Sequence, residues 1–301
     1  MKTLVLLDAH ALIHRAYHAL PKFTSKNTGE PTGALYGLST MLLKVIRELK
    51  PDYIVAAFDR PEPTFRHESY EAYKAKRPEA DEDLIKQLIR ARDIVEAFGI
   101  PILDAAGFEA DDILGTIVEQ TKKLKDTKTI IVSGDMDVLQ LVEGDRVVVF
   151  TLRKGIEDTV IYDEKKVEER YGFGPEQIPD FKGLKGDQSD NIVGVKGIGD
   201  KIATDIIKNF GTLENLYKKL EQDIPPSGEA GILKERIVRL LKEHKKDAFF
   251  SKELATIRRD APVKFEIPST KFETNKAKLK ALFIELGFTS LAARLDAASA
   301  D

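Results

Sequence analysis

The sequence predicts an α/β protein with a mainly parallel sheet flanked by helices, joined to a second, helical part. In its first half, short continuous apolar runs alternate with segments in which apolar residues recur every three or four positions. Such runs are typical of parallel strands covered by helices on both faces. After about residue 175 the strand-like runs stop, and glycines separate short helical segments. We therefore expect an α/β core over residues 1–175 and a helical domain over residues 176–295.

Each expected strand is a short run rich in Leu, Ile, Val and Phe. The runs lack the apolar–polar alternation of a half-exposed strand, which indicates burial on both faces of the sheet. The expected strands are TLVLL at 3–7, YIVAAF at 53–58, residues 100–103, KTIIVS at 128–133 and RVVVFT at 146–151.

Segments with helical spacing connect these strands and continue after them. One of them, residues 83–98, has an apolar face that we expect to be packed, with Ile85 and Ile89 beside that face. The other expected helices cover residues 34–49, a segment after Asp112, and residues 282–295.

Residues 60–82 fit neither pattern. They contain three prolines, many charges of both signs, and the aromatic residues Phe65, Tyr70 and Tyr73. A long segment of this kind is either a solvated surface loop or a functional excursion, and we give the two interpretations equal weight.

The composition excludes several classes of protein. The chain has 301 residues, of which 42% are hydrophobic and 32% charged, as expected of a globular protein. No apolar run is long enough to cross a membrane, and Asp8 and His10 interrupt the apolar start, which argues against a signal peptide. There is no cysteine, so disulfides and thiolate metal sites are excluded. We expect a cytoplasmic monomer that does not contact membranes.

Acidic residues follow several of the expected strands. Asp8 follows LVLL, Asp59 follows IVAAF, and Asp135 and Asp137 follow IIVSG. Because the carboxyl ends of parallel strands share one edge of the sheet, where ligands bind, we expect these acids to converge. Alone, each acid could be a turn residue, but turn chemistry does not explain why strand after strand ends in Asp.

Three more carboxylates are crowded into GFEADDILG: Glu109, Asp111 and Asp112. A helix cap explains one carboxylate at a helix start, but not three within four positions. Packed carboxylates need positive charge nearby, or some of them must be protonated. Mg²⁺ and Mn²⁺ prefer oxygen ligands, and two such ions roughly 3.5–4 Å apart can activate water and stabilise the leaving oxygen of a phosphodiester. We therefore expect a divalent metal centre here.

A glycine-rich turn follows two further acids, Asp187 and Asp190, and precedes an expected helix. Its backbone N–H groups can approach a phosphate, and the helix dipole favours an anion there. The spacing matches neither common nucleotide-binding glycine motif, so a nucleotide-binding loop fits poorly, whereas a plain helix–helix turn stays open as an alternative. The residues of this turn that we assign to DNA binding are Gly194, Lys196, Gly197, Gly199 and Lys201.

Together these motifs resemble the flap endonuclease (5′-nuclease) superfamily, in particular the 5′→3′ exonuclease domain of bacterial DNA polymerase I. They occur in the family's order and at similar spacing, and the resemblance covers roughly residues 3–295. It rests on LLDAHALIHRAYHAL (6–20), FDRPEPTFRHESYEAYKAKRP (58–78), GFEADDILG (107–115), SGDMDVLQL (133–141) and GDQSDNIVGVKGIGDKIA (186–203).

The resemblance implies a PIN-like nuclease core with a helical arch over about residues 60–95, and a helix–three-turn–helix in the helical domain. It implies a structure-specific 5′→3′ exonuclease and 5′-flap endonuclease that uses two or more Mg²⁺ or Mn²⁺ ions. The implied substrate is DNA with a 5′ flap, nick or gap, in replication and repair, with K⁺ an option at the helix–three-turn–helix. A DNA polymerase module would act in cis or in trans.

The resemblance also assigns residues. Lys74 and Arg77, with Tyr73, match arch positions that reach into the active site, where a cation can offset charge on the scissile phosphate. Arg15 and Arg66 become candidates for phosphate contacts. Neutralising the nine matching acids would change the formal charge from −3 to +6, so the net charge does not argue against DNA. The acids placed at the metal centre are Asp8, Asp59, Glu109, Asp111, Asp112, Asp135, Asp137, Asp187 and Asp190.

One position departs from the family. Six residues after Asp8, where polymerase I domains usually have a tyrosine, this chain has His14. A histidine can stack on a base near the cut, though less broadly than a tyrosine, and it can titrate near neutral pH. A histidine that is merely packed, or merely on the surface, is the alternative.

Three other functions stay open from the sequence. A PIN-like ribonuclease would share the acidic crevice but would not need the glycine turn. A non-catalytic protein that recognises branched DNA would lack some of the acids, and none is missing. A HAD-like phosphatase could use Asp135 and Asp137 but would leave the other acids unexplained. In the nuclease hypothesis the metals activate the water, so no histidine general base is required.

Overall fold

The computed structural model describes residues 1–152, 158–222 and 233–297. Within these residues a six-stranded sheet has the order β3-β2-β1-β4-β5-β6, in which β1 to β5 are parallel and β6 is antiparallel to β5. The predicted mainly parallel sheet is confirmed, whereas the antiparallel edge strand was not predicted. The strands are β1 (Lys2–Asp8), β2 (Tyr53–Ala57), β3 (Ile102–Leu103), β4 (Thr127–Val132), β5 (Val147–Leu152) and β6 (Thr159–Tyr162).

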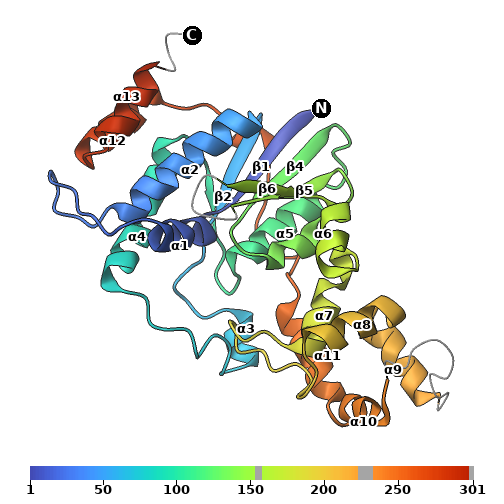
Figure 1. Ribbon diagram of the computed structural model, residues 1–301. Helices are drawn as coiled ribbons and strands as arrows, with labels where there is room; N and C mark the ends of the chain where they lie inside the picture. Colours follow the sequence, from blue (N-terminus) through green and yellow to red (C-terminus); the bar gives the residue numbers. More distant parts are fainter. Residues whose placement is uncertain (153–157, 223–232, 298–301) are drawn as a thin grey trace.

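Helices pack on both sides of the sheet, and a further group lies at the lower right in Figure 1. The three helices predicted within the first half are present, and their ends lie close to the predicted ones. The helices of the described residues are α1 (Ala9–Ala19), α2 (Gly33–Leu49), α3 (Phe65–Ser69), α4 (Glu82–Ala97), α5 (Ala110–Gln120), α6 (Glu164–Tyr171), α7 (Ile178–Lys185), α8 (Asp200–Phe210), α9 (Leu213–Glu221), α10 (Glu235–Glu243), α11 (Lys245–Ala255), α12 (Lys276–Glu285) and α13 (Thr289–Ala297).

Strand β1 shows how the sheet is buried on both faces. Leu4 and Leu6 belong to the core shared with α5, whereas Val5 and Leu7 belong to the core shared with α1, α2 and α4. Successive side chains of a strand point to opposite faces, so a continuous apolar run fills both cores. This packing holds the carboxyl end of β1 in place, immediately before the chain turns into α1.

Helix α1 begins directly after β1 and was not predicted as a helix. Leu12, Ile13 and Ala16 are buried in the core shared with α2. The carboxylate of Asp8 caps the helix by accepting a hydrogen bond from the N–H of Ala11 at 3.0 Å. The first candidate acid is therefore both the last residue of a strand and the cap of a helix.

Helix α4 follows the predicted pattern. Leu84 and Val95 are buried, while Ile85 and Ile89, beside that face, are 47% and 70% exposed. Neighbouring positions of a helix point about 100° apart, which turns these two isoleucines toward solvent.

The last two helices, which the prediction placed in the helical domain over 176–295, pack against the sheet side of the molecule. Phe283 of α12 packs on Phe98, with ring centroids 6.1 Å apart, and Leu291 of α13 is buried in the core shared with α2 and α4. Figure 1 shows α12 and α13 at the opposite end of the molecule from α7–α11. The returning chain runs so close to Gly99 (φ +78°) that a Cβ there would lie 2.3 Å from the carbonyl oxygen of Glu273. A division near residue 175 stays a proposal, and the closing helices belong with the sheet.

The excursion at residues 60–82 contains α3 followed by turns. It is tied to the loop that precedes α8, because the N–H of Lys74 donates to the carbonyl oxygen of Asp190 at 2.9 Å and the Asn191 amide donates to that of Ala72 at 2.7 Å. The excursion and the start of α4 occupy the region predicted as the arch. These contacts favour a functional excursion over a solvated loop.

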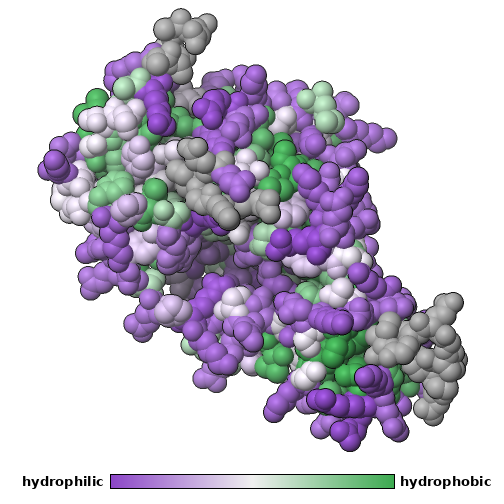
Figure 2. Space-filling view, in the orientation of Figure 1, coloured by the Kyte–Doolittle hydropathy of each residue, from purple (hydrophilic) through white to green (hydrophobic). Residues whose placement is uncertain are grey.

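Figure 2 shows one largely hydrophilic face with several smaller apolar patches, one of them at the lower right over the helical part. No helix among residues 1–152, 158–222 and 233–297 is both long and apolar enough to cross a membrane. The segment IPPSGEAG at 224–231, whose Pro, Gly and Ser content predicts a loop, lies outside the described residues.

Candidate active site

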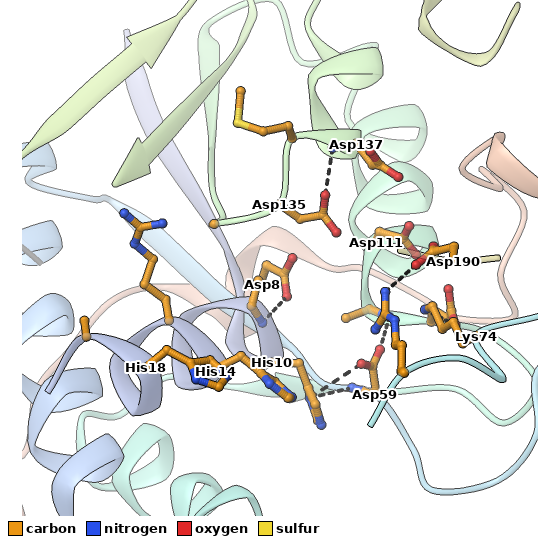
Figure 3. A pocket seen from close by; sticks show the side chains of 18 residues that line it. Asp8, His10, His14, His18, Asp59, Lys74, Asp111, Asp135, Asp137 and Asp190 are labelled. Carbon is orange, nitrogen blue, oxygen red and sulfur yellow. Dashed lines mark hydrogen bonds and ion pairs between the residues drawn. The ribbon is translucent and has the colours of Figure 1, made fainter. Parts of the chain in front are cut away.

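A cavity of about 810 Å³ opens at the carboxyl edge of the parallel strands. Asp8 comes from the end of β1 and Asp59 from just after β2, as Figure 3 shows. The sheet topology therefore brings together residues that are far apart in the sequence, as predicted. Seven of the nine predicted acids line this cavity: Asp8, Asp59, Glu109, Asp111, Asp135, Asp137 and Asp190.

Ser133 joins two of these acids. It is fully buried at the end of β4, and its hydroxyl donates a 2.7 Å hydrogen bond to Oδ2 of Asp8. The hydroxyl oxygen of Ser133 also accepts the N–H of Asp135 at 2.9 Å. One hydroxyl thus orients candidate ligands on the two central strands, and the sequence analysis did not single it out.

Burial and neighbouring carboxylates raise the pKa of several of these acids. Burial, together with the nearby Asp59 and Asp135, raises the pKa of Asp8 to about 7. Burial and Asp135 raise the pKa of Asp137 to about 6, although Lys182 opposes the shift. Burial and Asp112 raise the pKa of Asp111 well above its usual range. Such a set is stabilised by protons or by cations, and an all-oxygen set fits Mg²⁺ or Mn²⁺.

Among the described residues, no three Asp, Glu or His side chains lie close enough together to enclose an ion as they stand. Basic side chains hold several of the carboxylates instead. Lys74 donates to Oε1 of Glu109 at 2.7 Å, and Arg77 pairs with Asp190. Both bases line the cavity from the excursion, which is where they were expected.

Asp112 does not line the cavity. It is fully buried, and Arg66 donates to both of its oxygens, at 2.7 and 2.8 Å. The N–H groups of Glu109 and Arg258 also donate to it, at 3.1 and 2.8 Å. With both oxygens so occupied, Asp112 holds the start of α5 and the chain after α11 rather than facing the site, contrary to our expectation of a ligand.

Arg66 is likewise buried behind the wall, with 2% of its side chain exposed. Besides Asp112, it donates to the carbonyl oxygens of Leu254 and Thr256, at 2.9 and 3.0 Å. We expected a phosphate contact, but its donors are used within the protein. A buried, bidentate arginine of this kind joins α3, α5 and the segment after α11.

Tyr73 also departs from expectation. It is 3% exposed, and its hydroxyl donates to Oε2 of Glu109 at 3.0 Å and to Oδ2 of Asp190 at 3.2 Å. We expected it to face the DNA, whereas in this structure it positions two acids. Its neighbour Lys74, with φ of +56°, is the residue that reaches the cavity.

Asp187 lies beside the cavity rather than on its wall, and Lys182 of α7 connects it to the site. The Lys182 ammonium donates to both Asp137 and Asp187. Burial alone would raise the pKa of Asp187, but this lysine lowers it to about 2. Lys182 was not predicted as a site residue, although a lysine on the helix that leads into the GDQSD motif is a usable signal.

The glycine turn runs from α7 to α8, as predicted for a motif between two helices. Gly194 has φ of +66°, and a Cβ there would lie 2.2 Å from the backbone nitrogen of Gly186. Only glycine fits such a close approach of two backbones. Gly197, Gly199, Lys196 and Lys201 are exposed on the same loop and helix start.

Helix α1 supplies the other wall of the cavity. His10, His14, Arg15 and His18 all line it. The Nδ1 atom of His10 accepts the N–H of Asp59 at 3.1 Å. His14, the departure from the family's usual aromatic residue, is therefore at the site and on its exposed side.

Two adjoining stretches of the chain match one protein family. Residues 3–172 match its N-terminal resolvase-like domain, and residues 173–278 match its C-terminal SAM fold, both described as 5′-3′ exonuclease. The chain belongs to the 5′–3′ exonuclease family. The predicted family, and with it a 5′–3′ exonuclease as the class of activity, is confirmed.

Two curated relatives of this 5′–3′ exonuclease chain are DNA polymerases I. That of Bacillus caldotenax is 38% identical over 301 residues, which cover 100% of this chain and 33% of the relative. That of Bacillus subtilis (strain 168) is also 38% identical over 301 residues, with the same coverage. The chain thus spans about a third of the length of these polymerases.

Solved structures of similar fold include the flap endonuclease of bacteriophage T5 in a complex with DNA and metal ions. Its TM-score is 0.65 at 20% identity, and the match covers 100% of both chains. The catalytic core of Rad2 in complex with DNA substrate has a TM-score of 0.61 at 15% identity, covering 98% of this exonuclease chain and 92% of Rad2. These similarities confirm the predicted fold class.

Proposed function

We propose that this chain hydrolyses DNA phosphodiester bonds at 5′ ends, as a structure-specific 5′→3′ exonuclease and 5′-flap endonuclease in replication and repair. One observation carries the proposal: a single cavity is lined by carboxylates from four separate segments of the core and by two bases of the excursion, which pair with Glu109 and Asp190. Cations bound by the carboxylates, together with these bases, would offset the charge that develops on a phosphodiester during its hydrolysis.

We assign the metal ligands to the acids that line the cavity, with Asp135, Asp111 and Asp8 at its centre. Two or more Mg²⁺ or Mn²⁺ ions bound there would supply an activated water and neutralise the charge of the leaving oxygen. Asp187 contributes through Lys182, and Asp112 supports Glu109 from behind.

The bases of the excursion act on the substrate. Lys74 and Arg77 are held near the acids by Glu109 and Asp190, so each is positioned before DNA binds. A phosphate that enters the cavity can replace these carboxylates as the binding partner of Lys74 and Arg77. We assign Lys74 to the scissile phosphate, where a fixed positive charge stabilises the transition state more than the ground state.

We assign the glycine turn to binding of the DNA duplex. A side chain added at Gly199 would meet nothing within 4 Å, so the backbone at the start of α8 faces open space. Lys196 and Lys201 are exposed beside it. Backbone N–H groups at this helix start can bind a phosphate, with K⁺ as an additional option. We propose that this grip sets the distance between duplex and cut, in a monomer acting in the cytoplasm.

The substrate proposal is DNA with a 5′ flap, nick or gap, and the partner is a polymerase module in cis or in trans. The test is cleavage of a 5′-labelled flap duplex with Mg²⁺ and with EDTA, beside single-stranded RNA of matching length. Cutting near the junction that requires Mg²⁺ and spares RNA supports the proposal. Preferential cutting of RNA would favour a ribonuclease, and tight binding without cutting would favour a structural DNA-binding protein.

Two variants assign the chemistry. Asp135→Asn should abolish cleavage, since it removes a candidate ligand. Glu96→Gln changes an exposed carboxylate of α4 and serves as the matched control. Full activity of Asp135→Asn would contradict the metal assignment.

A further inference from the structure

Helix α1 carries three histidines at intervals of four residues: His10, His14 and His18. Residues four apart lie on the same face of a helix, and all three line the cavity. Figure 3 shows them in a row along the helix, with His10 beside Asp59 and with His14 and His18 successively farther from it. Their ring centroids are 6.4 Å apart for His10 and His14, and 6.5 Å apart for His14 and His18.

The three rings are not equivalent. His10 uses Nδ1 to accept the Asp59 N–H and packs edge-on against Phe58. In the part of the chain that the structure describes, we find no hydrogen bond or ion pair from the rings of His14 and His18. Both lie on the exposed side of α1, so their nitrogens are available to a ligand.

The surroundings keep His14 in the form that binds metals. Partial burial by the cavity walls, together with His10, His18 and Arg77, lowers its pKa. A neutral imidazole is the metal-binding form. The positive charge of Arg77 is offset by its pairing with Asp190.

We propose that His14 and His18 together bind one transition-metal cation of the Zn²⁺ or Ni²⁺ class, at a site separate from the carboxylate centre. Two histidines four residues apart on one helical face are a known arrangement for holding zinc. Imidazole suits Zn²⁺ and Ni²⁺, whereas Mg²⁺ prefers oxygen ligands. With bonds of about 2.0–2.1 Å, the two nitrogens would be roughly 3.3 Å apart, which needs the two rings to turn toward each other. Water would fill the remaining positions.

The consequence is inhibition, and this step rests on the proposed function. The site is on the wall of the cavity that also holds the acids, so a cation and its waters there occupy space that a DNA strand needs. The chain would therefore be slowed by Zn²⁺ or Ni²⁺ through a mechanism distinct from replacement of Mg²⁺ at the carboxylates.

The binding test is calorimetric titration of the full chain with Ni²⁺ in excess Mg²⁺. His14→Tyr and His18→Asn should each weaken Ni²⁺ binding by about tenfold or more, since each removes one of two ligands. His244→Gln, which changes a histidine of the distant helical part, should bind as the wild type does. Asp135→Asn should retain Ni²⁺ binding, which separates this site from the carboxylate centre.

Wild-type affinity in both His14→Tyr and His18→Asn would overturn the site, as would loss of Ni²⁺ binding in Asp135→Asn. The inhibition arm measures how far Ni²⁺ slows flap cleavage, relative to each protein's own rate without Ni²⁺. Equal inhibition of wild type and His14→Tyr would overturn the inhibitory role. If neither the wild type nor any variant cleaves DNA, the proposed function fails. The Ni²⁺ titration still tests whether His14 and His18 bind a metal ion.

Discussion

Ser133 and Asp8 connect the two central strands of the sheet through one 2.7 Å hydrogen bond at the floor of the cavity. The serine hydroxyl also accepts the N–H of Asp135, so it fixes a carboxylate on β1 relative to the backbone after β4. Metal ligands depend on such outer partners for their orientation. Ser133 is therefore a positioning residue for the carboxylate centre.

Ser133→Ala should weaken Mg²⁺ binding by roughly 10–100-fold, because Asp8 and Asp135 lose their common partner. The measurement is the Mg²⁺ concentration that gives half-maximal cleavage, together with the shift in Tm on adding Mg²⁺. Ser133→Thr keeps the hydroxyl and should recover most of the affinity. Ser39→Ala removes another fully buried hydroxyl, on α2, and should leave Mg²⁺ affinity unchanged. Equal Mg²⁺ affinity in Ser133→Ala and wild type would rule out the positioning role.

Arg66→Met should destabilise the protein by about 3–5 kcal/mol, because it leaves the buried Asp112 without its partner. Adding Asp112→Asn to this variant should recover part of the loss, since the unpaired charge is removed. Urea unfolding measures both. Arg47→Met, at an exposed ion pair with Glu48, should change stability by less than about 1 kcal/mol. If Arg66→Met lost as little stability as Arg47→Met, the buried ion pair would not be needed to hold these segments together.

The site illustrates what sequence can predict and where it stops. Asp111 and Asp112 are adjacent in sequence, and the crowding of acids predicted a ligand role for both. In a helix the two side chains point about 100° apart, so only one can face the cavity. Asp112 is turned away from the cavity by its hydrogen bonds with Arg66 and with the N–H of Arg258, and both of these residues are remote from it in the sequence. No local pattern contains that information.

The same limit explains the fold's unpredicted parts. Apolar runs and strand-end acids are local features, so the sheet and the position of the site followed from them. The apolar spacing over 282–295 indicated one helix, whereas the structure has the end of α12 and then α13 there. The spacing also did not show which surface Phe283 covers, which is the side of α4. Tyr73 is similar, since only tertiary contacts with Glu109 and Asp190 show it to be buried.

Lys74→Met should lower the single-turnover rate of flap cleavage by about 10²–10³-fold, as for removal of a group that stabilises transition-state charge. Flap-duplex affinity, measured without Mg²⁺, should change far less, because duplex phosphates are assigned to the glycine turn. Lys86→Met, at an exposed position of α4, is the control and should cleave normally. If Lys74→Met weakened binding as much as cleavage, its role would be to bind the strand.

Gly194→Ala should destabilise the chain by roughly 2–4 kcal/mol, since a Cβ would meet the backbone of Gly186 in addition to the strain of positive φ. Gly29→Ala isolates the second effect: Gly29 has φ of +74° with nothing within 4 Å, and should lose only about 1 kcal/mol. Urea unfolding compares the two. Gly194→Ala should also weaken duplex binding, whereas Gly29→Ala should not. Equal losses of stability would mean that the turn adapts to the added methyl group.

Asp8→Asn should make the metal-free chain more stable at pH 8 while abolishing its stabilisation by Mg²⁺. The pKa of Asp8 is raised to about 7 in the folded state from 3.8, mainly by burial, so the folded chain binds its proton more tightly than the unfolded chain does. In EDTA the stability contribution of this group is therefore complete below about pH 4 and is lost as pH rises to about 7. Mg²⁺ replaces the proton by binding the ionised carboxylate in the folded chain.

Tm measured in EDTA from pH 5 to 8 should fall less steeply for Asp8→Asn than for wild type, and Mg²⁺ at pH 8 should raise Tm only for wild type. An unchanged slope in the variant would show that other carboxylates of the cavity, such as Asp111, carry the uncompensated charge.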